Sequence, residues 1–349
     1  MHEATLYEKL PEQKVQCTAC NWYCTILPNQ TGICGVRKNI EGKLYLLVYG
    51  KAIAAHIDPI EKKPLFHFLP ETEVFSIGTI GCNFACGFCQ NWDISQSIRE
   101  LKQEGKISFQ ETSQSGKLGD DWPPKKIVET CVQKQIPSIA YTYNEPVIFF
   151  EYAFDTAKLG HKKGLKNVFV SNGFESKEAI KKIHPFLDGI NIDLKAFTEK
   201  FYQKTCKAKL EPVLKNIERV AKSDIWLEIT TLLVPGENDS KKELQEIAEF
   251  IARQSTDIPW HVTAFHPDYK MLDKNTTTHE KLVEAVEIGK KTGLKFAYIG
   301  NILDTEHSST YCPKCTKALI KRNYHSIIEH HIQKGKCEYC GEKIAGVWK

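Results

Sequence analysis

The sequence predicts an α/β fold organised around a parallel sheet, either open or closed into a barrel, with a cysteine-rich segment at each end. From residue 74 onwards, short apolar runs alternate with amphipathic helical patterns. Strands that alternate with helices are typical of parallel sheets, because each parallel connection has to cross over the sheet. In addition, most of the 13 cysteines fall into three groups, near the start, near residue 85 and near the end of the chain.

The expected elements follow one another along the chain with one interruption. The stretch from Ile98 to Trp122 is polar and too long for an ordinary connection, so we expect it to form a surface excursion or a lid. Strands are expected at 74–80, 137–143, 166–170, 188–193, 225–233, 258–265 and 295–299, and helices at 125–135, 146–160, 176–184, 210–222, 240–254 and 278–292.

Three parts are expected along the chain. The first is a cysteine-rich segment with a hairpin, since two strand-like runs, 44–49 and 52–57, meet at Gly50 and Lys51, with glycine at the first turn position. The second holds the alternating strands and helices, and the third is a cysteine-rich tail. The expected parts are residues 1–70, 71–303 and 304–349.

The composition is that of an ordinary soluble globular protein, with 42% hydrophobic and 26% charged residues. Residues 1–16 are polar, and no apolar run approaches the roughly 20 residues of a membrane span. We therefore expect no signal peptide, no membrane segment and a cytoplasmic location, where cysteines favour metal over disulfides. The net charge of +4 is concentrated in residues 312–349, which have eight Lys and Arg against three Glu.

The central cysteines, Cys82, Cys86 and Cys89, have the spacing C-x3-C-x2-C directly after an apolar run that ends at Gly81. A 4Fe-4S cluster has four iron corners and normally takes four thiolates. Three thiolates in one tight loop leave one iron open, where a small molecule can be held and reduced. A structural zinc site completed by a distant ligand is the alternative.

Two further cysteine groups have spacings that suit metal ions. Four cysteines within 18 residues near the N-terminus would bind a zinc ion or an auxiliary iron–sulfur cluster, or would simply be buried. In the tail, two C-x2-C pairs with a 21-residue spacer are typical of a zinc ribbon. The basic residues of the tail suit either a solvated surface or a docking surface for nucleic acid or protein. The N-terminal group is Cys17, Cys20, Cys24 and Cys34, and the tail group is Cys312, Cys315, Cys337 and Cys340.

Polar residues follow the expected strands, at the ends where the chemistry of parallel α/β barrels collects. We expect them to gather at one edge, together with the central cysteines. Glu145 could instead cap the following helix, and Asp193 with Lys195 could be a simple ion pair. The residues are Asn144, Glu145, Ser171, Asn172, Asp193, Lys195, Glu228, Thr230, Thr231, His266 and Asn301.

The stretch from Gly81 to Gln96, with Phe88 just before the third cysteine, resembles the signature of the radical S-adenosylmethionine (SAM) superfamily. Within the superfamily it is similar to the AmmeMemoRadiSam radical SAM enzymes, relatives of the pyruvate formate-lyase activating enzymes. The resemblance implies a partial (β/α) barrel of the TIM type. It also implies a 4Fe-4S cluster whose open iron is chelated by the amino and carboxylate groups of SAM.

The resemblance also implies roles for residues at the strand ends. Glu145 matches the carboxylate that holds the SAM ammonium group, in a motif whose two glycines are Tyr143 and Asn144 here. This departure leaves the backbone contacts of the motif open. The other residues expected to bind SAM on this resemblance are Asn144, Ser171, Asn172, Asp193, Lys195 and His266.

Two cysteines stand outside the three groups. Cys206 follows the fourth strand, so it is expected at the same edge, where its thiol would relay a radical or pack as a small hydrophobic group. Cys131 falls within a helical pattern and is expected in the core.

The function implied by the resemblance is reductive cleavage of SAM, which yields a 5′-deoxyadenosyl radical that abstracts hydrogen from a substrate. The substrate would be a small molecule, a partner protein that receives a glycyl radical, or an RNA held by the basic zinc ribbon. A multi-zinc scaffold without enzymatic activity is the alternative. Expected partners are an electron donor such as flavodoxin or ferredoxin, and Memo-like and AMMECR-like proteins.

Overall fold

A computed structural model describes residues 1–99 and 118–348 of the chain. Most of the expected excursion between Ile98 and Trp122 lies outside the described residues. Within them, no helix combines the length and the apolar character needed to cross a membrane.

The chain groups into two compact units. Unit 1 comprises Met1–Asp58 and Glu73–Asp188, and unit 2 comprises Pro59–Thr72 and Gly189–Lys349. Each unit contains a set of parallel strands with helical crossovers. The division into three parts, made from the sequence, stays a prediction.

The parallel strands of unit 1 are β9 (Glu73–Gly78), β11 (Ser138–Tyr141) and β12 (Lys166–Ser171), with β11 in the middle. Ser138 of β11 lies opposite both Val74 of β9 and Lys166 of β12. All four residues of β11 are buried, which explains why the strand has no alternation of polar and apolar residues. Because the strands run in the same direction, the segments that follow them leave the sheet at one edge.

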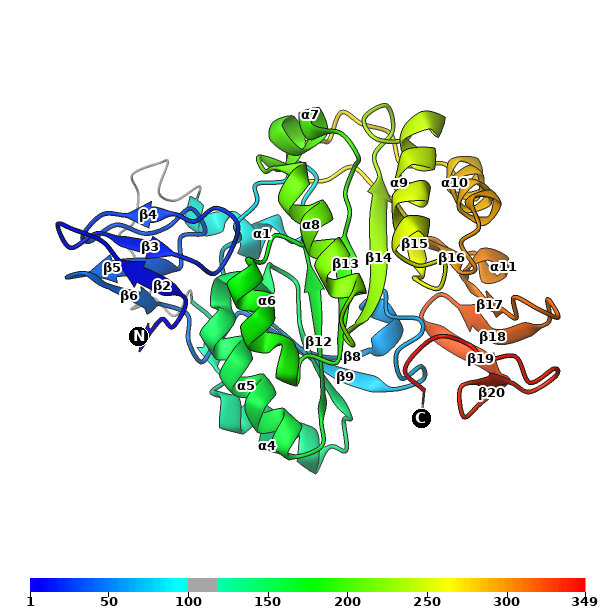
Figure 1. The fold of residues 1–349 in the computed structure, drawn as a ribbon, viewed down its shortest axis with the longest axis horizontal. Coiled ribbons are helices and arrows are strands. Elements are labelled where there is room, and N and C mark those ends of the chain that lie inside the picture. The colour runs from blue at the N-terminus through cyan, green and yellow to red at the C-terminus, as the bar shows by residue number, and fades with distance from the viewer. Residues whose placement is uncertain (100–117, 349) are drawn as a thin grey trace. The chain divides into compact units, whose positions relative to one another are not determined.

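Helices of unit 1 cross between these strands (Figure 1). Helix α5 packs against β11, β12 and α4. Pro124 occupies the first position of α4, where its missing N–H costs no hydrogen bond. The Ser176 hydroxyl caps α6 by accepting from the Ala179 amide. The bounds are α1 Trp92–Ser95, α4 Pro124–Gln133, η2 Pro146–Phe149, α5 Phe150–Lys162, α6 Lys177–Ile183 and η3 His184–Phe186.

The hairpin expected at Gly50 and Lys51 is wrong. Strand β6 (Lys43–Leu46) instead pairs with β5 (Arg37–Ile40), through a turn at Glu41 and Gly42. Both turn residues have positive φ, +50° and +78°, as a two-residue hairpin turn requires. The other strands before β9 or beside it are β1 His2–Glu3, β2 Tyr7–Lys9, β3 Val15–Cys17, β4 Thr25–Ile26, β7 Lys51–Ala52, β8 Ala54–Pro59 and β10 Asp120–Asp121.

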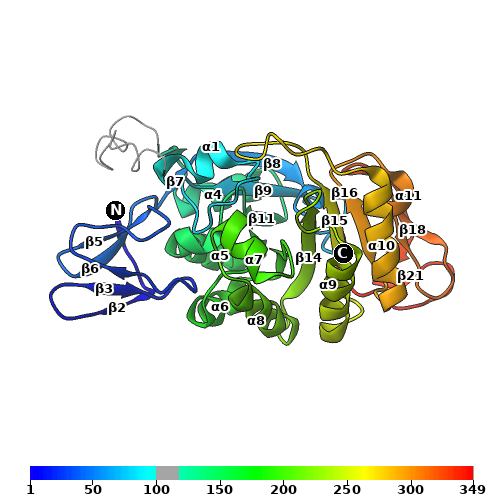
Figure 2. The same ribbon diagram turned by 90° about the horizontal axis from the view of Figure 1, so that it is seen from above.

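Unit 2 continues the alternation with four parallel strands that neighbour one another in sequence order. Helices α9 and α10 pack against each other, and Figure 2 shows them side by side. The bounds are η1 Ile60–Lys62, β13 Gly189–Asp193, α7 Glu199–Phe201, η4 Tyr202–Cys206, α8 Leu210–Ala221, β14 Trp226–Leu233, α9 Lys241–Gln254, β15 Trp260–Ala264, α10 His279–Thr292 and β16 Ala297–Gly300.

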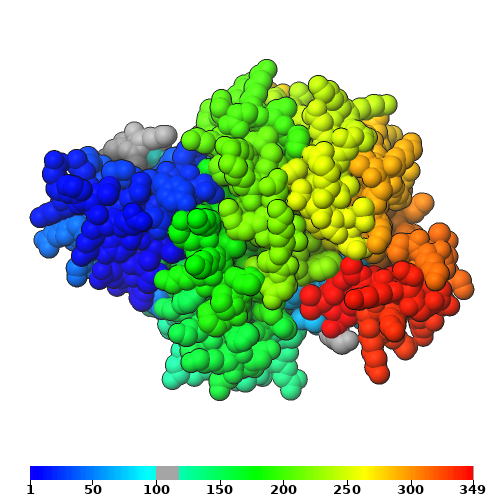
Figure 3. Space-filling view, in the orientation of Figure 1, coloured from blue at the N-terminus to red at the C-terminus, as the bar shows by residue number. Residues whose placement is uncertain are grey.

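The tail of unit 2 is a small antiparallel structure joined to the sheet by helix α11, which packs against both β16 and β18. Its residues, orange to red in Figure 3, form one continuous body. Cys312 and Cys337 belong to the same hydrophobic cluster as Phe66, Phe296 and Tyr298. The tail is therefore packed onto the rest of unit 2. The bounds are α11 Thr305–Ser308, β17 Thr310–Tyr311, β18 Ala318–Asn323, β19 Ser326–His330, β20 Ile332–Gln333 and β21 Lys336–Cys337.

These elements agree with the expected α/β fold with parallel strands. All seven expected strands and six expected helices are present, with ends that differ by a few residues. The π-helical turn η4 and the one-turn helix α11 were not expected, because such short elements have no periodicity to detect. Cys131 lies within α4 and is fully buried, as expected.

An ion pair ties the N-terminal strands of unit 1 to helix α5. Nη2 of Arg37, on β5, lies 2.6 Å from Oε2 of Glu151, and both side chains are only 2% exposed. The Arg37 Nε also donates to the Ile148 carbonyl at 2.9 Å, and the Thr5 amide donates to Glu151. Both charges are thus satisfied inside the protein.

We expect Arg37→Met to lower the free energy of unfolding by about 3–5 kcal/mol, because it leaves the Glu151 carboxylate buried without its partner. The matched control is Lys51→Met. Lys51 pairs with Asp121 at 2.8 Å, but both side chains are exposed, so its loss should cost less than about 1 kcal/mol. Urea denaturation measures both changes, and equal costs would contradict the structural role of the buried pair.

Candidate functional site

The loop after β9 holds the three central cysteines in unit 1. Burial raises the pKa of the Cys82 thiol, and the nearby Glu145, Cys86 and Cys89 raise it further. The Cys89 Sγ lies 3.2 Å from the Ser95 Oγ of α1. A thiol with a raised pKa stays protonated until a metal ion binds its sulfur and displaces the proton. The donor set therefore fits an iron–sulfur cluster.

The residues that follow β11 form hydrogen bonds with both ends of the cysteine loop. The Asn144 side chain accepts from the Thr79 amide at 3.1 Å and donates to the Gly81 carbonyl at 2.8 Å. On the far side of the cysteines, the Asn91 side chain donates to the Tyr143 carbonyl at 2.9 Å. Asn144, which was expected to bind SAM, is thus placed against the backbone that leads into Cys82.

Tyr143 has a backbone conformation that favours glycine. Its φ of +69° lies in the left-handed region, which non-glycine residues seldom adopt. The Tyr143 hydroxyl donates to Asp58 Oδ2 at 2.8 Å, and the His56 ring packs edge-on against the tyrosine. These contacts in unit 1 hold the tyrosine in a conformation that is rare for its type.

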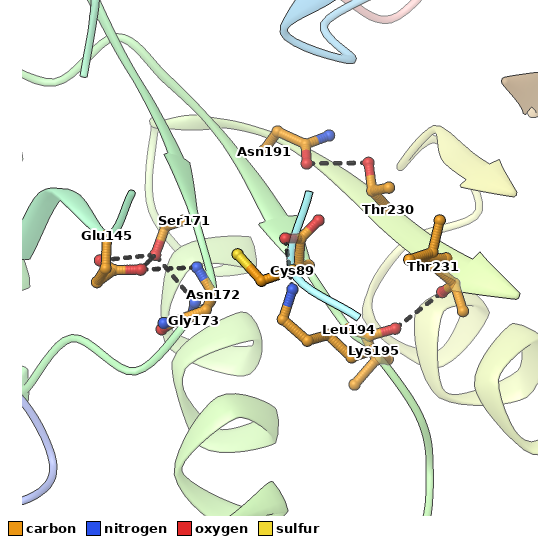
Figure 4. A network of polar contacts seen from close by, with 12 residues as sticks. Cys89, Glu145, Ser171, Asn172, Gly173, Asn191, Leu194, Lys195, Thr230 and Thr231 are labelled. Carbon is orange, nitrogen blue, oxygen red and sulfur yellow. Dashed lines mark hydrogen bonds and ion pairs between the residues drawn. The ribbon is translucent and has the colours of Figure 1, made fainter. Parts of the chain in front are cut away.

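Glu145 is buried, and Figure 4 shows it hydrogen-bonded to Ser171 and Asn172. Its carboxylate accepts from the Ser171 hydroxyl at 3.1 Å and from the Asn172 amide at 2.8 Å. It also accepts from the Val147 amide, so the helix-capping role weighed from the sequence is present as well. Burial, with the Glu175 carboxylate adding to it, raises the pKa of Glu145 well above its ordinary value. A cation placed beside this carboxylate would favour its charged form.

A further hydrogen bond connects β12 to the cysteine loop. The Asn172 side chain donates to the Asn83 side chain at 2.8 Å, and the Asn83 carbonyl accepts from the Trp22 indole at 3.0 Å. Asn83 was missed from the sequence because it lies between Cys82 and Phe84 with no pattern of its own. Glu175 was missed as well, although it follows β12 by only four residues.

The N-terminal cysteines lie near one another in unit 1. Burial raises the pKa of Cys17 to about 11, while the Arg37 guanidinium opposes this rise and the Cys34 and Cys24 thiols add to it. Burial likewise raises the pKa of Cys20, with Cys17 adding most among the neighbouring thiols. The pKa values of Cys17 and Cys20 thus respond to the other thiols of the group, and whether the four cysteines bind zinc, bind an auxiliary cluster or are simply buried stays a prediction.

The tail cysteines have the geometry of a tetrahedral metal site. The Cys312 and Cys340 sulfurs are 3.6 Å apart, and the Cys315 and Cys337 sulfurs are 3.7 Å apart. All four sulfurs lie within 4.8 Å of one another. Zinc bound tetrahedrally at about 2.3 Å from each sulfur would set the sulfurs about 3.8 Å apart. The four cysteines thus fit a zinc ion.

The expected SAM-site residues of unit 2 lie at the ends of β13 and β15. The Lys195 Nζ is 2.8 Å from Asp193 Oδ2, and the lysine side chain is only 13% exposed. The carbonyl of Leu194 accepts from the Thr231 hydroxyl, as Figure 4 shows. His266 follows β15 and is exposed. Cys206 is fully buried in η4, which favours packing over a radical relay.

The expectation that Glu228 belongs to the carboxyl edge is wrong. It lies near the start of β14, where it accepts from the Phe66 and His67 amides at 3.0 and 2.8 Å. His261 is 2.6 Å from the same carboxylate. Strand position, and not only side-chain type, decides which polar residues can reach the edge.

Comparison with known proteins decides the family. The sequence model described as the radical SAM superfamily matches residues 76–251. Protein MJ0808 of Methanocaldococcus jannaschii is 41% identical over 347 residues, which cover 99% of each chain. The chain belongs to the radical SAM superfamily. Membership of this superfamily implies a 4Fe-4S cluster and SAM.

Solved structures of radical SAM enzymes are also similar to this chain. A domain of pyruvate-formate lyase-activating enzyme from Bacteroides vulgatus is 24% identical, covering 46% of this chain and 98% of its own, with a TM-score of 0.41. A radical SAM methyltransferase from Sphaerobacter thermophilus is 13% identical, covering 66% of this chain and 67% of its own, with a TM-score of 0.49.

We expect Gly81→Ala to disturb the cysteine loop, because a Cβ there would lie 2.6 Å from the Cys34 carbonyl oxygen. Gly164→Ala is the matched control. Both glycines have positive φ, +93° and +76°, but nothing lies within 4 Å of a Cβ at Gly164.

Backbone strain alone should cost both variants about 1 kcal/mol of unfolding free energy. The clash should cost Gly81→Ala more, and should also lower the iron retained after reconstitution. Urea denaturation and iron analysis measure the two effects. Equal costs and equal iron would show that the Cys34 backbone does not restrict the loop.

Proposed function

We propose that this radical SAM protein cleaves SAM reductively, giving methionine and a 5′-deoxyadenosyl radical that abstracts hydrogen from a substrate. The observation that supports this best is that residues 143–145 after β11 combine two roles: Tyr143 and Asn144 hold the cysteine loop, and Glu145 supplies the buried carboxylate. When bound to the three thiolates, a 4Fe-4S cluster would supply the electron for the cleavage.

The residues of unit 1 have distinct roles in this proposal. Cys82, Cys86 and Cys89 hold the cluster, and Glu145 accepts hydrogen bonds from the SAM amino group. Ser171 and Asn172 orient the Glu145 carboxylate, since both donate to it. Because the acceptor is fixed before SAM arrives, little ordering is required on binding.

Unit 2 supplies the remaining proposed contacts. Lys195 would offset the SAM carboxylate, with Asp193 orienting the lysine through their 2.8 Å ion pair. His266, at the end of β15, would contact SAM. Cys206 would act as a radical relay only if the buried η4 turn opened towards the substrate.

We propose zinc for the four tail cysteines, because their sulfur separations match tetrahedral coordination. The zinc would be structural, since two of its ligands lie in the hydrophobic cluster of unit 2. The candidate substrates are a small molecule, a protein that receives a glycyl radical, and an RNA. Flavodoxin or ferredoxin as electron donor, and Memo-like and AMMECR-like proteins as partners, stay proposals.

Anaerobic reconstitution tests the proposed chemistry. We expect about four iron atoms per chain at the central cysteines, in addition to zinc bound by thiolates. When dithionite and SAM are added, we expect 5′-deoxyadenosine to form. Cys86→Ala should lose both the cluster and the nucleoside, whereas Cys131→Ala, which removes a buried thiol of α4, should keep both. Chromatography and metal analysis give the results. No nucleoside from a fully reduced cluster would overturn the proposal.

The raised pKa of Glu145 predicts a pH-dependent affinity for SAM. At a pH below this pKa, the Glu145 carboxyl is neutral in the free protein. It becomes charged beside the SAM cation, so binding releases a proton. The affinity for SAM should therefore rise with pH, by up to about tenfold per pH unit. Glu145→Gln should bind SAM more weakly, and its affinity should lack the increase with pH that titration of Glu145 causes.

The ratio of wild-type to Glu145→Gln dissociation constants isolates the effect, because titration of the SAM amino group is common to both proteins. Glu175→Gln removes a charge that raises the pKa of Glu145. Its affinity should therefore reach a plateau at lower pH than that of the wild type. Equilibrium dialysis over a pH series measures all three proteins, and a ratio independent of pH would refute the assigned titration.

A further inference from the structure

Two histidines and an aspartate converge in unit 2, at a place that neither the SAM chemistry nor the cysteines use. His279 begins α10, Asp304 caps the start of α11, and His307 lies within that four-residue helix. The His279 Nε2 is 2.7 Å from Asp304 Oδ2, and the His307 Nδ1 is 2.8 Å from the same oxygen. Two imidazoles from separate elements therefore point at a single carboxylate oxygen.

The carboxylate is held in place by its other oxygen. Asp304 Oδ1 accepts from the His307 backbone amide at 2.8 Å, so Oδ2 is left to face the two rings. The Asp304 side chain is only 7% exposed and His307 only 15%, whereas His279 is 51% exposed. The cluster thus has a rigid buried side and one side that is open to solvent.

The three side chains also meet the distance requirement of a metal site. Their ligand atoms all lie within 4.8 Å of one another, which among the described residues holds for this group and the tail cysteines. Two imidazole nitrogens and one carboxylate oxygen are a donor set for zinc-class divalent cations. Three protein ligands leave coordination positions open for water or another small ligand.

We propose that His279, Asp304 and His307 bind a divalent transition-metal cation of the zinc class. On binding, each neutral ring changes tautomer: the proton that His279 Nε2 or His307 Nδ1 shares with Asp304 moves, through solvent, to the other nitrogen of the same ring. The lone pair freed on the first nitrogen binds the cation, so each ring stays neutral and no redox partner is needed. Asp304 Oδ2 changes from the acceptor of the two ring hydrogen bonds to a ligand of the cation.

The cation would join two segments that are distant in sequence. His279 starts the helix after β15, while Asp304 and His307 lie in the connection from β16 to the tail. Helix α11 itself packs against β16 and β18. A bound cation would therefore fasten the start of α10 to the segment that leads into the four-cysteine tail. This inference does not rest on the proposed SAM chemistry.

The test is a titration of the purified full chain with Co²⁺, after its thiolate sites have been filled. We expect one additional Co²⁺ per chain, with the visible bands of nitrogen and oxygen ligands and without thiolate charge-transfer bands. His279→Gln and His307→Gln should each weaken this binding about tenfold or more. The control, His161→Gln, changes an exposed histidine of α5 in unit 1 and should bind like the wild type.

Asp304→Asn separates metal binding from folding. Asparagine is as good a helix cap as aspartate, so α11 should keep its start, but the charged ligand is lost. We expect this variant to fold, as judged by circular dichroism, and to lose the additional Co²⁺. No additional Co²⁺ in the wild type would overturn the proposal. Equal binding by the wild type and all three site variants would overturn it as well.

Discussion

The fixed position of one buried carboxylate, that of Glu145, is the constraint on which the site in unit 1 depends. Three donors hold it, from η2, from the end of β12 and from the residue after β12. The two residues before Glu145 hold the cysteine loop. Because one short turn supports both the acceptor and the cysteines, a shift of β11 would move both together. The parallel register of β9, β11 and β12 makes this possible, since it brings their ends to one edge.

The N-terminal segment of unit 1 contacts the loop of the central cysteines. Trp22 donates to the Asn83 carbonyl, and the Cys34 carbonyl lies where a side chain on Gly81 would be. The buried pair of Arg37 and Glu151 fastens the same segment to α5, the helix that follows the Glu145 turn. The backbone of Cys34, one of the N-terminal cysteines, therefore lies against the glycine that leads into the loop of the central cysteines.

Sequence reasoning was most successful where the signal was local. Apolar runs and helical periodicity predicted all the parallel strands, and the spacing of Cys82, Cys86 and Cys89 predicted one loop. It was wrong for the hairpin at Gly50, because an apolar strand does not specify its partner, and the turn at Glu41 and Gly42 had the better geometry. It also misplaced Glu228, whose carboxylate accepts from the backbone of Phe66 and His67, far away in sequence.

By itself, the sequence determined the type of fold, the superfamily signature and the three groups of cysteines, since each depends on residues within a few positions of one another. Only the tertiary structure decided which donors reach Glu145, that Asn83 and Glu175 join its surroundings, and that His279 meets Asp304 across 25 positions. The physical reason is the separation in sequence of the residues involved. Periodicity and ligand spacing can be read from neighbouring residues, whereas a hydrogen bond between distant segments depends on how every element between them packs.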